Sequence, residues 1–378
     1  MVSLEESRRK IDEIDKELVS LFEKRMNVVL DVAKYKKENN LPVFQGNREE
    51  QVLKKAVDNL NDKDYAKEAK EFLNSIMEIS RGLQKRKIAG NDDISNLEIK
   101  KDNIDLSAKI GFQGVPGAFS EEALIKIFGE NSNRVSYNEF EDVFVAIEND
   151  EIKYGVLPIE NSSTGSISAV MDLLKKYDFH ILAEETIKIN QHLVGIKGTT
   201  LQDIKEVYSH PQGIEQSSEF LKQYDWQLIP FHNTATSAKF VKDTGDKTKA
   251  AIAGIRSSKL YGLEIIKERI NTLKDNTTRF IVVSKDLVVP KNADKVSVAF
   301  TVPNKSGKLF NILRYFAENN INMIKIESRP MKDTPWSYLF YVAFEGSIES
   351  NEAKKALELI KNSSEYFRLL GAYKSVIG

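Results

Sequence analysis

Two basic residues near the N-terminus fall on one face of a predicted helix. Lys36 follows Arg25 by eleven residues, which is about three helical turns plus 20° and roughly 16 Å between Cα atoms. Two long basic side chains at that separation can converge on a small anion. Arg8 would lie about 25 Å from Arg25 and about a quarter-turn off its face, so one straight helix cannot bring both arginines to one small ligand. If both serve one site, Arg8 must come from a second chain.

Further polar residues accompany this pair. Arg48 and Glu49 stand at the start of a second predicted helix, and Ser80 and Gln84 lie four residues apart on one face of a third. A single exposed Lys or Arg on a helix is usually solvated or held in a weak surface pair. The companion residues therefore favour an anion site over isolated surface charges.

Three loops later in the chain gather polar groups. The first, GFQGVPGAFSEEA, has a G-x-x-G-x-x-G spacing, which is neither the dinucleotide fingerprint nor a Walker loop, so we reject a nucleotide site there. The second, IENSSTGSI, holds Asn161, Ser162 and Thr164, and the third, NTTRF, holds Thr278 and Arg279. Taken alone, a cluster like the second is often only a helix cap and turn.

The elements that must position these residues change along the chain. Apolar residues at three- and four-residue spacings, without Pro or Gly, predict one long amphipathic helix over 4–39. Two more helices should follow, from near Arg48 and from about Tyr65 to Lys87. From Lys109 short apolar strands alternate with helical segments, which predicts an α/β region of mostly parallel strands. From Asp294 the order β-α-β-β-α-β predicts a small ferredoxin-like sandwich.

These changes divide the chain into three domains. We expect a helical domain at 1–88, a polar linker at 89–107, an α/β domain at 108–288 and an α+β domain at 294–378. A helix of about 50 Å cannot bury its own apolar stripe, so the first domain needs a partner, either another chain or the rest of the protein.

The composition narrows the function. Lys and Arg (55) nearly balance Asp and Glu (56), so no global basic field attracts nucleic acid or anionic lipid. There is no cysteine, and none of the four histidines are paired at metal-ligand spacing. The N-terminus is charged, and no uncharged apolar stretch approaches the roughly 20 residues of a membrane span. We expect a cytoplasmic protein that needs no metal or other cofactor and binds neither nucleic acid nor a membrane.

The motifs RRKIDEIDKEL, EKRMNVVLDVAKYK, LPVFQGNREEQVL and SRGLQ, within residues 8–84, resemble the all-helical chorismate mutase family. In that family two intertwined protomers share two sites, and one arginine crosses over. Gln45 departs from the family, which usually has an acidic residue there, and this change predicts weaker substrate binding. The resemblance implies that the chorismate carboxylates are bound by Arg25, Arg48 and the partner subunit's Arg8. It also implies that Lys36 and Gln84 contact the ether oxygen, that Glu49 binds the ring hydroxyl and that Ser80 lines the pocket.

The loops IEN-S-x-x-G, SHPQG and T-R-F, over about residues 109–285, resemble prephenate dehydratase. That family has two α/β lobes with the site in the cleft, like a type II periplasmic binding protein. The chain is expected to cross to the second lobe near Asn190 and to return before Asn276.

The same resemblance assigns roles in dehydration. Thr278 should lie beside the leaving hydroxyl, as its proton donor or as the group that orients one, and the source of the proton stays open. Arg279 should anchor a carboxylate. His210 is better interpreted as a loop residue than as the acid. Neutral hydrogen bonds should come from Asn161, Ser162, Thr164 and Gln212.

The motifs PNKSGKLFNIL and IKIESRP resemble an ACT regulatory domain of the phenylalanine-binding kind. Gly307 permits close backbone approach at a strand–helix turn, and Leu309 offers apolar packing. Lys308 departs from the family, which often has Ala there, and this alters the pocket. A simple dimerisation module is the alternative. The resemblance implies a phenylalanine site at Gly307, Leu309, Glu327, Ser328, Arg329 and Pro330.

Together these motifs predict a bifunctional enzyme of phenylalanine biosynthesis. It would convert chorismate to prephenate, and prephenate to phenylpyruvate by decarboxylative dehydration, with feedback inhibition by phenylalanine. The crossing of Arg8 requires a homodimer or a dimer of dimers. Two alternatives stay open. One is a dehydratase whose helical region is only a dimer scaffold, which Gln45 favours, and the other is a non-catalytic two-lobed solute-binding protein.

Overall fold

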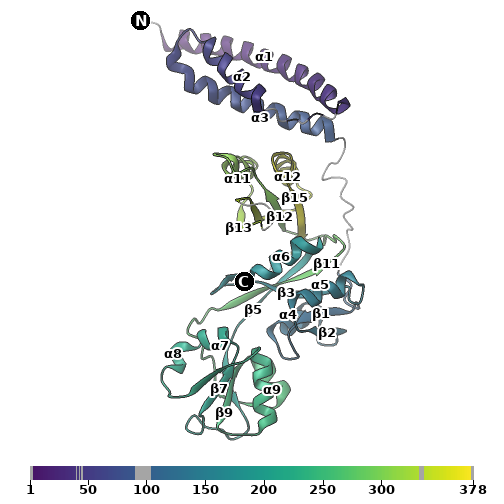
Figure 1. Ribbon diagram of the computed structural model, residues 1–378, viewed down its shortest axis with the longest axis vertical. Coiled ribbons are helices and arrows are strands. Elements are labelled where there is room, and N and C mark those ends of the chain that lie inside the picture. The colour runs from purple at the N-terminus through teal and green to yellow at the C-terminus, as the bar shows by residue number, and fades with distance from the viewer. Residues whose placement is uncertain are drawn as a thin grey trace.

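The computed structural model of the chain describes residues 3–39, 41, 43, 46–89, 104–331 and 336–375. They form a helical N-terminal region, two mixed sheets and a four-stranded C-terminal sheet (Figure 1). Gln45 and most of the predicted linker lie outside the described residues. No helix of the described segments is long and apolar enough to cross a membrane, and no group of His, Asp or Glu in them could hold a metal ion.

The N-terminal region is a long helix packed along a shorter one. The helix predicted over 4–39 is α1 (Leu4–Glu38), and the Ser3 side chain caps its start by accepting from the Glu6 amide at 3.1 Å. It lies directly against α3 (Ala66–Ala89) (Figure 1). The segment that connects α1 to α3 in the sequence contains α2 (Gly46–Asp58) and a short 3₁₀ turn (Lys63–Tyr65). The apolar stripe of α1 is largely uncovered in the single chain. Its exposed members include Leu4, Ile11, Ile14, Leu18, Leu21 and Val28.

The first α/β lobe is a mixed sheet with the strand order β2-β1-β3-β11-β5. Strands β1, β2 and β3 are parallel, while β11 lies antiparallel between β3 and β5. The strands are β1 (Ile110–Gln113), β2 (Arg134–Tyr137), β3 (Tyr154–Asn161), β5 (His180–Lys188) and β11 (Thr277–Ser284), with β4 (Gly165–Ser166) paired to β3. The helices are α4 (Phe119–Phe128), α5 (Phe140–Glu148) and α6 (Ser168–Tyr177).

The second lobe is another mixed sheet, with the order β10-β6-β9-β7-β8. The chain enters it between Lys188 and His192 and leaves it between Lys267 and Thr277, as the sequence predicts. Strand β11 is antiparallel to its neighbours in the first sheet, and β6 is antiparallel to its neighbours in the second, so neither sheet is as parallel as expected. Its elements are β6 (His192–Gly195), β7 (Glu206–Ser209), α7 (Pro211–Glu215), α8 (Ser218–Leu221), β8 (Gln227–Pro230), α9 (Thr234–Thr244), β9 (Lys249–Ala253), α10 (Ile255–Tyr261) and β10 (Glu264–Lys267).

The C-terminal domain has the predicted β-α-β-β-α-β order, with the strands arranged β13-β14-β12-β15. One sheet face packs on its two helices, and the other shares a core with the first lobe. Gly371 allows this contact, because an added Cβ would lie 2.0 Å from the Ile181 carbonyl oxygen. The elements are β12 (Lys295–Thr301), α11 (Lys308–Glu318), β13 (Met323–Pro330), β14 (Tyr338–Glu345), α12 (Asn351–Ser363) and β15 (Phe367–Tyr373).

Candidate active sites

The helical region brings four of the predicted residues together between α1 and α3. Arg25 Nη1 donates to Ser80 Oγ at 2.5 Å, and Lys36 Nζ donates to the Val43 carbonyl at 2.6 Å. Lys36, Ser80 and Gln84 are buried, and the Gln84 carboxamide oxygen has no partner in the described part of the chain. Burial lowers the pKa of both Arg25 and Lys36, and Glu49 partly opposes this for Lys36. The cluster can therefore offer desolvated cations to an anion, and the unpartnered Gln84 oxygen can accept a hydrogen bond.

Arg81 joins this cluster although no role was predicted for it. Its Nη1 lies 2.5 and 2.6 Å from the two carboxylate oxygens of Glu49, the residue expected to bind the ring hydroxyl. The signal was available, because Arg81 directly follows Ser80 in the SRGLQ motif. Arg48 and Arg8 are exposed in the single chain, and Arg8 lies in the first turns of α1. The chain alone therefore assembles only part of the predicted mutase site.

The first lobe places Thr278 opposite Asn161. Thr278 is the second residue of β11, Asn161 ends β3, and the two residues are register partners. Asn161 Nδ2 donates to Thr278 Oγ1 at 2.9 Å, while Asn161 Oδ1 accepts from the amides of Ser163 and Thr164 at 2.9 and 3.1 Å. These backbone donors fix which end of the carboxamide faces the threonine. Because the threonine oxygen accepts a bond, its own proton can be donated elsewhere.

Asn276 is a second donor beside Thr278, and it was not assigned a role from the sequence. Its Oδ1 accepts from Asn161 Nδ2 at 2.8 Å, which directs its own amide nitrogen away from Asn161. That nitrogen is buried and has no partner among the described residues. A buried unsatisfied donor costs about 1–3 kcal/mol, so it calls for a ligand oxygen or a water.

The two lobes meet at Thr164 and Gln212. Gln212 Nε2 donates to Thr164 Oγ1 at 3.0 Å, which links α7 to the loop after β3. His210 caps α7 by accepting from the Gln212 amide at 3.2 Å, and burial lowers the pKa of this imidazole. Ser162 Oγ accepts from the Thr277 amide at 2.9 Å, so it ties the end of β3 to the start of β11. We name Asn161, Ser162, Thr164, Gln212, Asn276 and Thr278 the interlobe site.

Arg279 does not join the interlobe site. Successive side chains of a strand point to opposite faces, so Arg279 faces away from Thr278. Its Nη1 lies 3.1 Å from Glu160 and its Nε lies 3.8 Å from Glu184, which pairs with the buried Lys295 of β12 at 2.6 Å. The carboxylate-anchor role expected for Arg279 stays a prediction, and an anion held there would lie on the face of β11 opposite Thr278. The two carboxylates beside it are also paired with Lys295 and Lys325 of the C-terminal domain.

The expected regulatory residues fall at two places in the C-terminal domain. Gly307 (φ +77°) and Leu309 are at the start of α11. Glu327 to Pro330 end the edge strand β13, where alternate side chains turn towards the first lobe. Glu327 bonds Ser166, and Arg329 Nη1 donates to Ser168 at 2.6 Å. The edge strand thus contacts the end of the IENSSTGSI loop at Ser166 and the start of α6 at Ser168.

Comparison with known proteins finds a matching family for each of the three regions of the chain. The chain matches the chorismate mutase type II family over residues 7–85, prephenate dehydratase over 110–287 and the ACT domain over 296–358. A bifunctional chorismate mutase/prephenate dehydratase of Buchnera aphidicola is 32% identical, over 97% of this chain and 95% of the relative. The chain belongs to this bifunctional family. It carries the chorismate mutase and prephenate dehydratase activities, which serve phenylalanine biosynthesis. This excludes the alternative of a non-catalytic solute-binding protein.

Two further relatives cover the dehydratase and ACT part. An arogenate dehydratase/prephenate dehydratase from Arabidopsis thaliana is 36% identical, over 74% of this chain and 75% of the relative. The crystal structure of prephenate dehydratase from Arthrobacter aurescens, in complex with L-Phe, is 28% identical, with a TM-score of 0.65 over 71% of this chain and 90% of that one. Sequence and fold together thus support the dehydratase assignment, while the bifunctional assignment rests on the full-length relative and on the mutase match.

Proposed function

We propose that the two reactions occur at two separate sites, the helical cluster and the interlobe site. The observation that carries this assignment is the bond from Asn161 to Thr278, which leaves a threonine proton available where the two lobes meet. The helical cluster is made of other elements, α1 and α3, and shares no residue with it. Substitutions should therefore separate the two activities, and this is the test described in the Discussion.

In the mutase site, the chemistry needs cations and donors but no covalent partner. Chorismate is a dianion that rearranges through a compact transition state in which the ether oxygen gains negative charge. Arg25 can grip a carboxylate by paired hydrogen bonds. Lys36 and the buried Gln84 amide are placed to stabilise the charge that develops at the ether oxygen. Arg81 orients Glu49 towards its role at the ring hydroxyl.

The mutase site is completed by a second copy of the chain. The apolar stripe of α1 is exposed in the single chain, and Arg8 is exposed near its start. Apolar patches of this length on one helix mark an interaction surface. A partner α1 packed on this stripe would bury it and deliver the partner subunit's Arg8 to the cluster around Arg25. We therefore propose a homodimer as the smallest active unit, either alone or within a dimer of dimers.

In the interlobe site, prephenate loses carbon dioxide and its ring hydroxyl. The carbon–carbon bond to the carboxylate breaks, its electron pair enters the ring, and the hydroxyl leaves as water after gaining a proton. Thr278 donates this proton or orients the group that does, because Asn161 occupies its acceptor side. Asn276, Gln212 and Ser162 supply neutral hydrogen bonds that hold the substrate. The aromatic product drives the step, so orientation is the main contribution of the enzyme.

Phenylalanine is the proposed effector of the ACT domain. Arg329 and Pro330 line a pocket of about 810 Å³ between β13 and the helices α5 and α6. Arg329 also bonds Ser168 and lies 3.3 Å from Asp172, so an effector at this edge can displace α6 and the neighbouring catalytic loop. The L-Phe complex of the Arthrobacter relative supports the choice of effector.

Millimolar phenylalanine is expected to lower the dehydratase rate on prephenate, because its binding at the ACT domain alters the loop after β3. The measurement is phenylpyruvate formation over a phenylalanine titration, with alanine, which lacks the ring, as the matched control. A dehydratase rate unchanged by millimolar phenylalanine would contradict the regulatory role and favour a simple dimerisation module.

A further inference from the structure

A bulge interrupts strand β3 just before the end that carries Asn161. Arg279 of β11 pairs with Glu160, but the next residue of β11 pairs with Pro158, so Ile159 is an extra residue in β3. Neighbours in a regular strand point to opposite faces, whereas Ile159 and Glu160 both line a small cavity beneath the C-terminal domain. Proline, which cannot donate to a ladder, is typical of such a bulge.

The bulge turns Asn161 to the face of Thr278. Before the bulge, Leu157 and Ile159 pack towards the C-terminal domain, and Val156 packs on the opposite face of the sheet with α4. With regular alternation Asn161 would follow Leu157 and Ile159 and point towards the C-terminal domain. The extra residue places it on the other face, where it donates to Thr278 at 2.9 Å. This bond therefore depends on the bulged register.

The two strands that carry this bond are not held equally. Strand β11 keeps one continuous register with β5 from Thr277 to Val282, so the position of Thr278 does not depend on β3. Beyond the bulge, β3 contributes only Glu160 and Asn161 to its pairing with β11. A slip of one residue reverses every side chain of a strand. The contacts made by the Glu160 side chain can therefore decide which way Asn161 points.

Lys325 of the edge strand β13 contacts this segment from the C-terminal domain. Its Nζ lies 3.3 Å from the Glu160 carboxylate and donates to Ser166 Oγ at 2.8 Å. Ser166 is the register partner of Glu160 in β4, so one ammonium group contacts both strands of the hairpin that carries the Asn161 loop. Arg279 brings a second cation to Glu160, at 3.1 Å. The Lys325 side chain is 18% exposed, so salt screens this contact less than a surface pair.

We propose that Lys325 is a positioning residue for dehydration, which acts through Glu160 to hold β3 in the bulged register. This role rests on the proposed function of the Asn161–Thr278 pair in the dehydratase. A slip of β3 would carry Glu160 away from both cations and turn Asn161 away from Thr278. Lys325 lies on the face of the sheet opposite Thr278, so it does not touch a substrate bound at the interlobe site.

Lys325→Met tests this role in the full chain, because it keeps the length of the side chain and removes its charge. It is expected to lower the dehydratase kcat about tenfold, with KM within about twofold, because couplings between contacting groups are commonly of this size and a misplaced donor slows the chemical step. Lys325→Arg keeps the charge and should retain most of kcat. An unchanged kcat in Lys325→Met overturns the proposal.

A second variant tests the route through Glu160. Glu160→Gln leaves the C-terminal domain intact and should lower kcat at least as much as Lys325→Met. Combining the two substitutions should slow the enzyme no further, because each removes the same contact. Additive losses overturn the route through Glu160. The matched control is Lys374→Met, which removes an exposed pair with Asp294 within the C-terminal domain and should leave kcat unchanged.

Hydrogen exchange reports the register without reference to catalysis. The Ser162 amide donates to the Thr277 carbonyl of β11 at 2.9 Å, so its protection depends on how β3 pairs with β11. The peptide that covers residues 160–166 should exchange faster in Lys325→Met and at the normal rate in Lys374→Met. A lower kcat with unchanged exchange overturns the proposal, as does faster exchange with an unchanged kcat. A dehydratase rate retained in Thr278→Ala would instead contradict the proposed function, which the exchange rate does not test.

Discussion

Thr278→Ala is expected to abolish the dehydratase and to leave the mutase at its full rate. The Thr278 hydroxyl accepts from Asn161 at 2.9 Å, and in the proposed mechanism it donates a proton to the leaving hydroxyl or orients the group that does. Loss of a positioned proton donor typically lowers a rate about 10²–10⁴-fold. The mutase cluster is built from α1 and α3 and shares no contact with this threonine. The measurements are phenylpyruvate formation from prephenate and loss of chorismate, on the same preparation.

Thr278→Ser is the matched control, because it keeps the hydroxyl and removes only a methyl group. It should retain most of the dehydratase rate. If both activities fell together in Thr278→Ala, the two sites would be coupled or wrongly assigned. If Thr278→Ala kept its dehydratase rate, the proton would come from a group other than Thr278.

Arg25→Ala should have the opposite effect, abolishing the mutase and sparing the dehydratase. Arg25 is partly buried and bonded to Ser80 at 2.5 Å, so its charge is desolvated and held in place before substrate arrives. Removal of one such stabilising group lowers kcat about 10²–10³-fold. Lys24→Ala is the matched control, because Lys24 is the exposed neighbour of Arg25 on the same helix. It should leave both rates unchanged.

Mixing of inactive chains tests the crossing arginine directly. Arg8→Ala and Arg25→Ala chains should each lack mutase activity as homodimers. A mixed dimer has one site with Arg25 from one chain and Arg8 from the other, and one site that lacks both. Exchange of subunits should therefore restore mutase activity, to at most half per mixed dimer. No recovery after verified exchange would show that Arg8 does not cross, and a fully active monomer would contradict the dimeric site.

The sequence predicted those features that depend on local pattern. Periodicity and caps predicted the length of α1, because an apolar repeat of 3.6 residues without Pro or Gly is typical of an α-helix and not of a strand. The strand and helix order of the C-terminal domain followed in the same way. The loops of Asn161 and Thr278 also stood out as polar clusters, whereas the roles of these residues were predicted from the resemblance to prephenate dehydratase.

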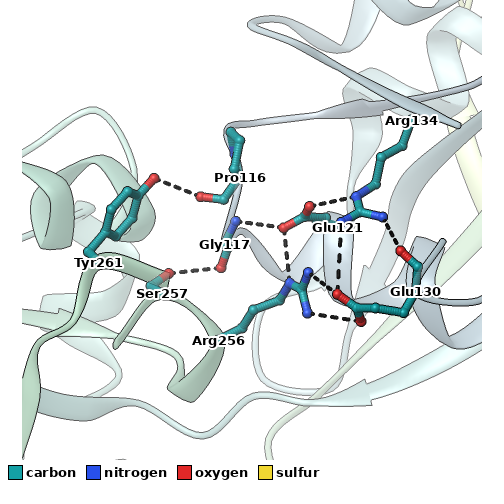
Figure 2. A network of polar contacts seen from close by, with 8 residues as sticks. All are labelled: Pro116, Gly117, Glu121, Glu130, Arg134, Arg256, Ser257 and Tyr261. Carbon is teal, nitrogen blue, oxygen red and sulfur yellow. Dashed lines mark hydrogen bonds and ion pairs between the residues drawn. The ribbon is translucent and has the colours of Figure 1, made fainter. Parts of the chain in front are cut away.

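Features that depend on register and on distant contacts were not predicted. Arg279 lies next to Thr278 in the sequence, yet strand alternation turns it to the opposite face, towards Glu160. The bond from Asn161 to Asn276 joins residues that only the pairing of β3 with β11 brings together. The hydrogen bond from Ser257 of α10 to the Gly117 carbonyl joins the two lobes (Figure 2), and no local sequence pattern predicts this contact. Antiparallel insertion of β11 was missed for the same reason.

The central claim is that one chain carries two independent active sites. The most direct measurement supplies the purified chain with chorismate and, separately, with prephenate, and follows chorismate loss and phenylpyruvate formation. We predict that the chain consumes both substrates, and that chorismate yields phenylpyruvate through prephenate. Conversion of prephenate with chorismate left untouched would contradict the account, because the helical region would then be only a dimer scaffold.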